Sequence, residues 1–147
     1  MKAPAATPFC ALFLLALLLP LIVPSTWARD RLAPTYTATM VESEFRSLDD
    51  VDPEKLTGIW LVQFLPGEAL SIILNGEIVI EGDWVLKDEV LTLTQMSGPL
   101  VCPYDGADTA IYRVSFRGFS VSFEKEKDDC PERTAVLTRG VFRASAK

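Results

Sequence analysis

Short alternating stretches of apolar and polar residues, each bounded by turn residues, constrain this chain more than any other feature. Between Glu77 and Lys87 one face carries mainly apolar residues at every second position, as in a half-buried β-strand. Asn75-Gly76 precedes this stretch, and that dipeptide is among the strongest hairpin signals in sequences. The same pattern continues from Gly58 onward, so the sequence predicts an all-β fold.

Counting these stretches gives seven short strands, or eight if residues 35–41 join them. The expected strands are residues 56–64, the stretch that ends at Leu74, 77–87, 90–94, 111–116, 119–123 and 134–143. Hairpins at such short spacing favour a single up-and-down antiparallel β-barrel, which leaves no exposed sheet edge. An immunoglobulin-like sandwich is the alternative. It is weakened because Asp128 occupies the position where that fold places a tyrosine.

The chain begins with one positive charge and an apolar block, then small residues before Arg29. This order is typical of a secretory signal peptide over residues 1–28, cleaved after Ala28. An uncleaved membrane anchor is the alternative, and Pro20 and Pro24 argue against it. The sequence therefore predicts a protein secreted to the extracellular space or periplasm, with no stable membrane anchor after cleavage.

The rest of the chain then forms an N-terminal arm and one barrel domain. In the arm, residues 29–56, we expect the possible extra strand and a short helical turn begun by Pro53 and capped by Asp52. The barrel domain covers residues 57–145. Removing Lys2 with the leader changes the net charge from −6 to −7. So acidic a surface makes nucleic acid a poor partner.

The cysteines predict one disulfide. Cleavage removes Cys10 and leaves Cys102 and Cys130, an even pair in an exported chain. Such a bond would place the loop after Thr94 and the charged run Glu124–Glu132 at the same end of the molecule.

The sequence offers little for catalysis. The chain has no histidine, so the usual general base and the commonest metal ligand are both missing. Ser122 and Lys125 have the spacing of a Ser-x-x-Lys motif, but on a strand they point to opposite faces. The acidic stretch around Asp49 and Glu54 lacks the spacing of a calcium loop and is better interpreted as solvated. We therefore expect no enzyme activity, no metal site and no cofactor.

Three residues give the chain a resemblance to the lipocalins. Gly58 and Trp60 match the Gly-x-Trp of the first lipocalin strand, and Arg143 matches the arginine near the end of that barrel. The resemblance implies that Trp60 and Arg143 pack together and close the barrel floor, with Gly58 leaving room beside the indole. It also implies that the open end of the barrel holds a small apolar molecule.

The alternation itself predicts which side chains point inward. The expected inward set is Val62, Phe64, Leu70, Ile72, Ile78, Ile80, Trp84, Leu91, Leu93, Tyr112, Val114, Phe119, Val121 and Phe123. The residues expected to line a ligand are Phe64, Ile72, Ile80, Trp84, Leu93, Tyr112, Val114, Val121 and Phe123.

Two binding functions follow, and they differ in where the partner lies. In the first, a small apolar molecule or lipid occupies the barrel. In the second, the interior is solid, and loops at the disulfide end, including Tyr104, form a protein-binding or inhibitory surface. A cavity above about 300 Å³ would favour the first function, and a filled interior would favour the second.

Overall fold

A computed structural model of the chain describes residues 32–103 and 105–145. The predicted signal peptide (1–28), the first residues of the expected arm and Tyr104 lie outside the described residues. The elements are β1 (Thr35–Met40), η2 (Glu42–Glu44), α1 (Pro53–Leu56), β2 (Gly58–Phe64), η3 (Pro66–Glu68), β3 (Ala69–Leu74), β4 (Glu77–Lys87), β5 (Val90–Ser97), β6 (Ala110–Arg117), β7 (Ser120–Lys127), α2 (Pro131–Arg139) and β8 (Phe142–Ala144).

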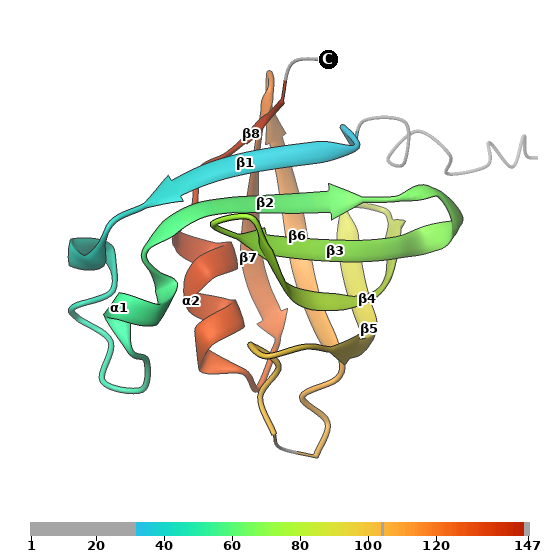
Figure 1. The fold of residues 1–147 in the computed structure, drawn as a ribbon. Coiled ribbons are helices and arrows are strands. Elements are labelled where there is room, and N and C mark those ends of the chain that lie inside the picture. Colours follow the sequence, from blue (N-terminus) through green and yellow to red (C-terminus); the bar gives the residue numbers. More distant parts are fainter. Residues whose placement is uncertain (1–31, 104, 146–147) are drawn as a thin grey trace, which may run out of the picture.

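The eight strands form one closed antiparallel barrel in the order of the chain (Figure 1). Closure occurs where β8 returns to β1, with Tyr36 opposite Ala144 and Thr37 opposite Arg143. The predicted fold class is therefore confirmed, with eight strands rather than seven, and the sandwich alternative is excluded. The possible extra strand in the arm is β1, which pairs with β2 along its whole length.

Tight turns join most neighbouring strands. Asn75 and Gly76 both have positive φ, as the hairpin turn predicted there requires. Gly118 alone has positive φ in the turn between β6 and β7, which fits a turn that needs glycine only at its first central position. The predicted helical turn in the arm is α1, where Asp52 accepts a hydrogen bond from the Glu54 amide at 3.2 Å.

The predicted last strand, residues 134–143, was wrong over most of its length. Residues Pro131–Arg139 form helix α2, and β8 covers only Phe142–Ala144. Pro131 stands at the start of the helix, and Arg133, Val136 and Leu137 turn one buried face inward at helical spacing. This burial outweighs the strand preference of Thr134, Val136 and Thr138.

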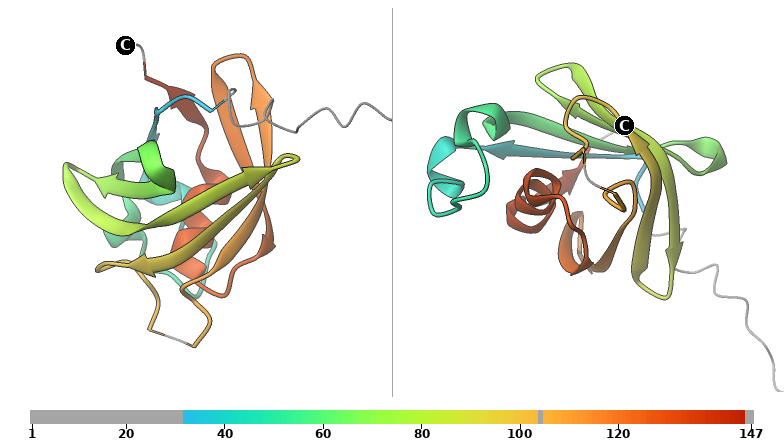
Figure 2. Two further views of the ribbon diagram at one scale, coloured as in Figure 1. Left: turned by 90° about the vertical axis from the view of Figure 1, so that its right-hand side faces the viewer. Right: turned by 90° about the horizontal axis from the view of Figure 1, so that it is seen from below.

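Helix α2 occupies the side of the barrel where strand pairing is shortest. β8 pairs with β7 only at Ser120 and Val121, and the helix packs against β7 beyond them. The views agree that α2 lies between β1 and the β6–β7 pair (Figure 2). The helix therefore supplies apolar side chains where β8 is too short to do so.

Two residues of the expected inward set point outward instead. Ile78 is 51% exposed, because the register between β3 and β4 shifts by one residue there and turns Val79 inward. Phe119 is 86% exposed, because it lies in the β6–β7 turn rather than in the strand. The other twelve residues of the set are buried.

Candidate functional site

Side chains fill the barrel interior where a ligand was expected. All nine predicted lining residues belong to one apolar cluster, and each is 6% exposed or less. Aromatic rings meet edge to face across this interior, with the centroids of Phe64 and Trp84 5.1 Å apart. A hollow lined by Trp60, Ile72 and Ile80 measures about 10 Å³, which is room for about one water molecule. Over the described residues, the interior is therefore a packed core.

The expected floor pair of Trp60 and Arg143 is not formed. Trp60 pairs in register with the buried Ala38, whereas Arg143 pairs with the next residue, Thr37. Neighbouring residues of a strand point to opposite faces of a sheet, so the indole lies inside and the guanidinium lies outside. Trp60 instead donates a hydrogen bond from Nε1 to the Leu56 carbonyl at 2.8 Å. The arginine that lines the same hollow as Trp60 is Arg133 of α2.

Gly58 leaves room for the Asn75 side chain rather than for the Trp60 indole. A β-carbon on Gly58 would lie 2.3 Å from the Asn75 side chain, and the backbone has φ of +147°. The Asn75 side chain accepts a hydrogen bond from the Ile59 amide at 3.0 Å. Glycine at position 58 therefore makes room for this turn residue, and the predicted space beside the indole was a wrong interpretation.

A buried polar cluster closes the end of the barrel that carries the disulfide. Arg133 and Asp128 have fully buried side chains and form an ion pair, with Arg133 Nε 2.7 Å from Asp128 Oδ2. Arg133 also donates to the Ala107 carbonyl at 2.9 Å, and the Tyr112 hydroxyl donates to Asp128. The cluster joins β6, α2 and the loop between β5 and β6. Buried charges need such partners, and this pairing stabilises the fold.

Burial raises the pKa of the Tyr112 hydroxyl above its ordinary value, and the neighbouring Asp128 carboxylate raises it further. A tyrosine with a raised pKa keeps its proton at neutral pH and cannot act there as a base. The hydroxyl also lies below the surface, because Tyr112 has no exposed area. Tyr112 is therefore part of the core rather than a reactive group.

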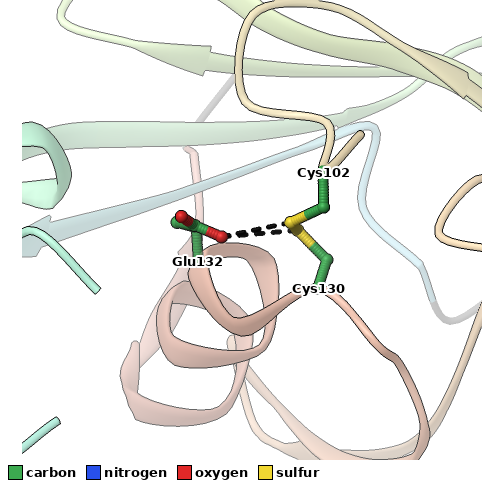
Figure 3. Close-up of side chains that lie close together, drawn as sticks. All are labelled: Cys102, Cys130 and Glu132. Carbon is green, nitrogen blue, oxygen red and sulfur yellow. Dashed lines mark hydrogen bonds between the residues drawn. A yellow bond between two sulfur atoms is a disulfide. The ribbon is translucent and has the colours of Figure 1, made fainter. Parts of the chain in front are cut away.

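The predicted disulfide between Cys102 and Cys130 is present, with the two α-carbons 5.5 Å apart. It ties the β5–β6 loop to the start of α2, so the two segments lie at one end as expected. The charged run Glu124–Glu132 is not a loop over most of its length, because β7 extends to Lys127 and α2 begins at Pro131. Glu132 follows on the first turn of α2, and its Oε2 lies 3.1 Å from Cys102 Sγ (Figure 3). A sulfur in a disulfide carries no proton, so Glu132 is a neighbour of this bond and does not accept a proton from it.

These three side chains also have the spacing of metal ligands, since their ligand atoms lie within 4.8 Å of one another. Cysteine binds metals as a thiolate, however, and here the two sulfurs are bonded to each other. The group is therefore a structural crosslink. Beside it, an open groove of about 270 Å³ runs between α1 and the β5–β6 loop, lined by Asp52, Lys55, Pro99, Leu100, Val101, Cys102, Pro103 and Glu132.

The opposite end of the β6–β7 pair carries a different surface. Phe119 and Val141 are 86% and 64% exposed, and Arg117 and Arg143 are exposed beside them. An open groove of about 210 Å³ runs between Val141 and Ser120 over the outer face of β6 and β7. We call Arg117, Phe119, Ser120, Val141 and Arg143 the hairpin-end surface. It is the second candidate for a binding site.

Part of this arrangement could have been predicted from the sequence. Pro131 can begin a helix, and on such a helix position 133 shares a face with the apolar residues Val136 and Leu137, which would have placed Arg133 next to the core. No local sequence signal predicts the hydrogen bond between Tyr112 and Asp128, because these residues lie 16 positions apart on the chain. The exposure of Phe119 follows from its place after Gly118 in a turn.

Comparison with known proteins gives no relative. A scan against protein-family models, a search of curated proteins and a search of solved structures each found no match. The closed eight-stranded barrel is compatible with a lipocalin-like barrel. The Arg143 part of that resemblance is lost, and Gly58 and Trp60 alone remain.

Among the described residues, no helix is both long and apolar enough to cross a bilayer.

Proposed function

We propose that this protein is an exported binding module that recognises another protein through its outer surface and holds no ligand inside its barrel. The observation that carries the proposal is the filled interior: nine buried side chains occupy the predicted ligand space, and the hollow beside them measures about 10 Å³. A pocket for a small apolar molecule needs about 300 Å³ or more.

The crosslinked end of the barrel supports this proposal. The Cys102–Cys130 disulfide suits an oxidising compartment outside the cytosol. It also fixes a loop and a helix to each other, and a rigid surface loses less conformational entropy when it binds a partner. Net charge of −6 for the whole chain keeps such a module soluble.

A test of the filled interior separates this function from the carrier function. Native mass spectrometry of protein purified from its own source, followed by titration with a fluorescent fatty-acid analogue, should show neither an apolar adduct nor saturable binding. A stoichiometric apolar adduct on the natural protein would overturn the proposal.

The Phe123→Ala variant supplies the positive control. Phe123 is 4% exposed and packs against Tyr112 and Phe142, so its truncation should open a dry apolar cavity. Small aromatic molecules such as benzene should raise the melting temperature of this variant and leave that of the natural protein unchanged. The comparison shows that the assay detects a cavity when one exists.

A further inference from the structure

We infer that the hairpin-end surface binds a protein segment that presents a carboxylate group next to an apolar side chain. This inference rests on the proposed function, since it assigns that function to one surface and names the chemistry of the partner. Three observations carry it: an aromatic ring that the turn does not require, two arginines that have no carboxylate partner among the described residues, and an apolar groove that Arg117 lines.

The ring of Phe119 lies outside the packed core. The β6–β7 turn requires a glycine at position 118, where φ is +58°, but places no such demand on the next residue. A polar side chain would serve equally well there, yet the chain places a phenylalanine that is 86% exposed. Its backbone is held in place, because the Phe119 carbonyl accepts a hydrogen bond from the Ala144 amide at 2.7 Å. The turn therefore presents an apolar anchor on a fixed support.

Two arginines lie on the same outer face as this turn. Ser120 is in register with Arg117 on one side and with Arg143 on the other, so all three side chains leave the sheet together. Neighbouring strands are about 4.8 Å apart, which puts the two arginine α-carbons roughly 10 Å from each other. Both side chains are exposed. One carboxylate above Ser120 is therefore within reach of two guanidinium groups and a hydroxyl.

These arginines have no carboxylate partner among the described residues, in a chain whose net charge is −6. Elsewhere in that part of the chain, Arg113 pairs with Glu126, Arg46 with Glu42 and Arg133 with Asp128. Guanidinium groups bind carboxylates through two parallel hydrogen bonds, and arginine is enriched among residues that dominate binding energy at interfaces. The local positive charge is thus available to an incoming anion.

The groove between Val141 and the outer faces of β6 and β7 supplies the apolar part of the site. It holds about 210 Å³ and is lined by Ser115, Arg117, Ser120, Val121, Ser122 and Val141. That volume suits one or two side chains of an extended segment rather than a folded domain. An acidic residue over Ser120 would place its apolar neighbour in this groove or against Phe119.

An anionic membrane also presents negative groups next to apolar ones, but the net negative charge of the protein disfavours binding to it. A bilayer is an extended negative plane that meets many surface charges of this acidic protein at once. A short segment senses charges only within a Debye length of about 8 to 10 Å, and within that range the two arginines dominate. The surface therefore favours a peptide over a lipid headgroup.

The test uses the exported chain, a phage-displayed library of random peptides, and vesicles of phosphatidylcholine with phosphatidylserine. Selected peptides should be enriched in glutamate or aspartate next to leucine or an aromatic residue. A fluorescein-labelled selected peptide should lose affinity about tenfold with Arg117→Gln and with Arg143→Gln, in keeping with one charged hydrogen-bonding group each. Phe119→Ser should cost about tenfold as well, and added salt should weaken binding.

Two control variants make the same kinds of substitution away from the hairpin-end surface. Lys87→Gln removes one positive charge at another turn, and Val85→Ser removes an apolar side chain that is 49% exposed on β4. Both should leave the peptide affinity unchanged. Melting temperatures of all variants show whether each is folded; if Arg143→Gln fails to fold, Arg117→Gln and Phe119→Ser carry the test.

The outcomes separate this inference from the proposed function. Peptides that bind equally well to the Arg117 and Phe119 variants would overturn the inference and leave a surface-binding protein in place. Failure to select any acidic and apolar peptide would overturn it too, as would vesicle binding that depends on the two arginines. An apolar adduct in the barrel would instead overturn the proposed function itself.

Discussion

At the disulfide end of the β6–β7 pair, Arg133 and Asp128 are fully buried and paired with each other. At the hairpin end of the same two strands, Arg117 and Arg143 are exposed and have no carboxylate partner among the described residues. A buried charge without a partner would cost several kcal/mol, so the fold itself demands the first arrangement. It makes no such demand at the hairpin end. The comparison therefore separates charges that serve stability from charges that the fold does not require.

The apolar residues of the two ends differ in the same way. Tyr112 has no exposed area beside Asp128, whereas Phe119 is 86% exposed beside Arg117. An isolated exposed apolar residue is ordinary, but Phe119 lies in the turn next to Arg117, which lines an apolar groove. If the first end serves stability and the second does not, substitutions should destabilise the protein at the disulfide end and leave its stability nearly unchanged at the hairpin end.

The largest effect is expected at the buried ion pair. Asp128→Ala leaves the Arg133 guanidinium buried without its carboxylate and should lower the free energy of unfolding by about 3 to 5 kcal/mol. Urea denaturation followed by tryptophan fluorescence measures this loss. The matched control is Asp129→Ala, because Asp129 is exposed and should change stability by no more than about 0.5 kcal/mol. Equal losses in both variants would contradict a structural role for the cluster.

Loss of the disulfide should have the next largest effect. The bond closes a segment with a sequence separation of 28, for which loop entropy predicts about 3 to 4 kcal/mol of stabilisation. The double variant Cys102→Ser with Cys130→Ser should therefore unfold at lower urea, and added reductant should leave its midpoint unchanged. Reductant should shift the natural protein toward the same midpoint. A loss below about 1 kcal/mol would mean that the buried cluster holds this end without the crosslink.

The features that the sequence predicted correctly are mostly those that depend on residues close together on the chain. Local signals such as Asn75-Gly76 and strict alternation gave the barrel and most of its inward residues, because these features act between neighbours on the chain. The cysteine pair predicted one long-range contact, because the expected cleavage of a leader would leave only two cysteines. Helix α2 was missed although Pro131 signals its start, since Thr134 and Val136 also suit a strand. The Trp60–Arg143 pairing failed because one position along β1 decides which face Arg143 takes.

High pH should lower the free energy of unfolding in a graded way. Burial, and then the charge of Asp128, raise the pKa of Tyr112 above 10, and burial also raises that of Tyr36. The stabilisation is fully present below the unfolded pKa of about 10 and is lost as the pH rises toward the folded values. Tyr112 should cost up to about 1.4 kcal/mol per pH unit above 10, and Tyr36 should cost less, because its hydrogen bond with Ala33 opposes the effect of burial. Urea denaturation at several pH values measures this loss. The free energy of unfolding of Tyr112→Phe should fall less steeply with pH than that of the natural protein, and equal slopes would contradict a buried, protonated Tyr112.

The smallest effect is expected at the residue on which the hairpin-end surface most depends. Phe119→Ala should change the free energy of unfolding by no more than about 0.5 kcal/mol, because the ring is 86% exposed and the turn requires only Gly118. Phe123→Ala, on the same strand pair but 4% exposed, should cost about 3 to 5 kcal/mol. Urea denaturation of both variants compares the loss of stability for the same Phe→Ala change at an exposed and at a buried position. If Phe119→Ala cost more than about 1 kcal/mol, the ring would serve the fold, and its exposure would no longer indicate a partner.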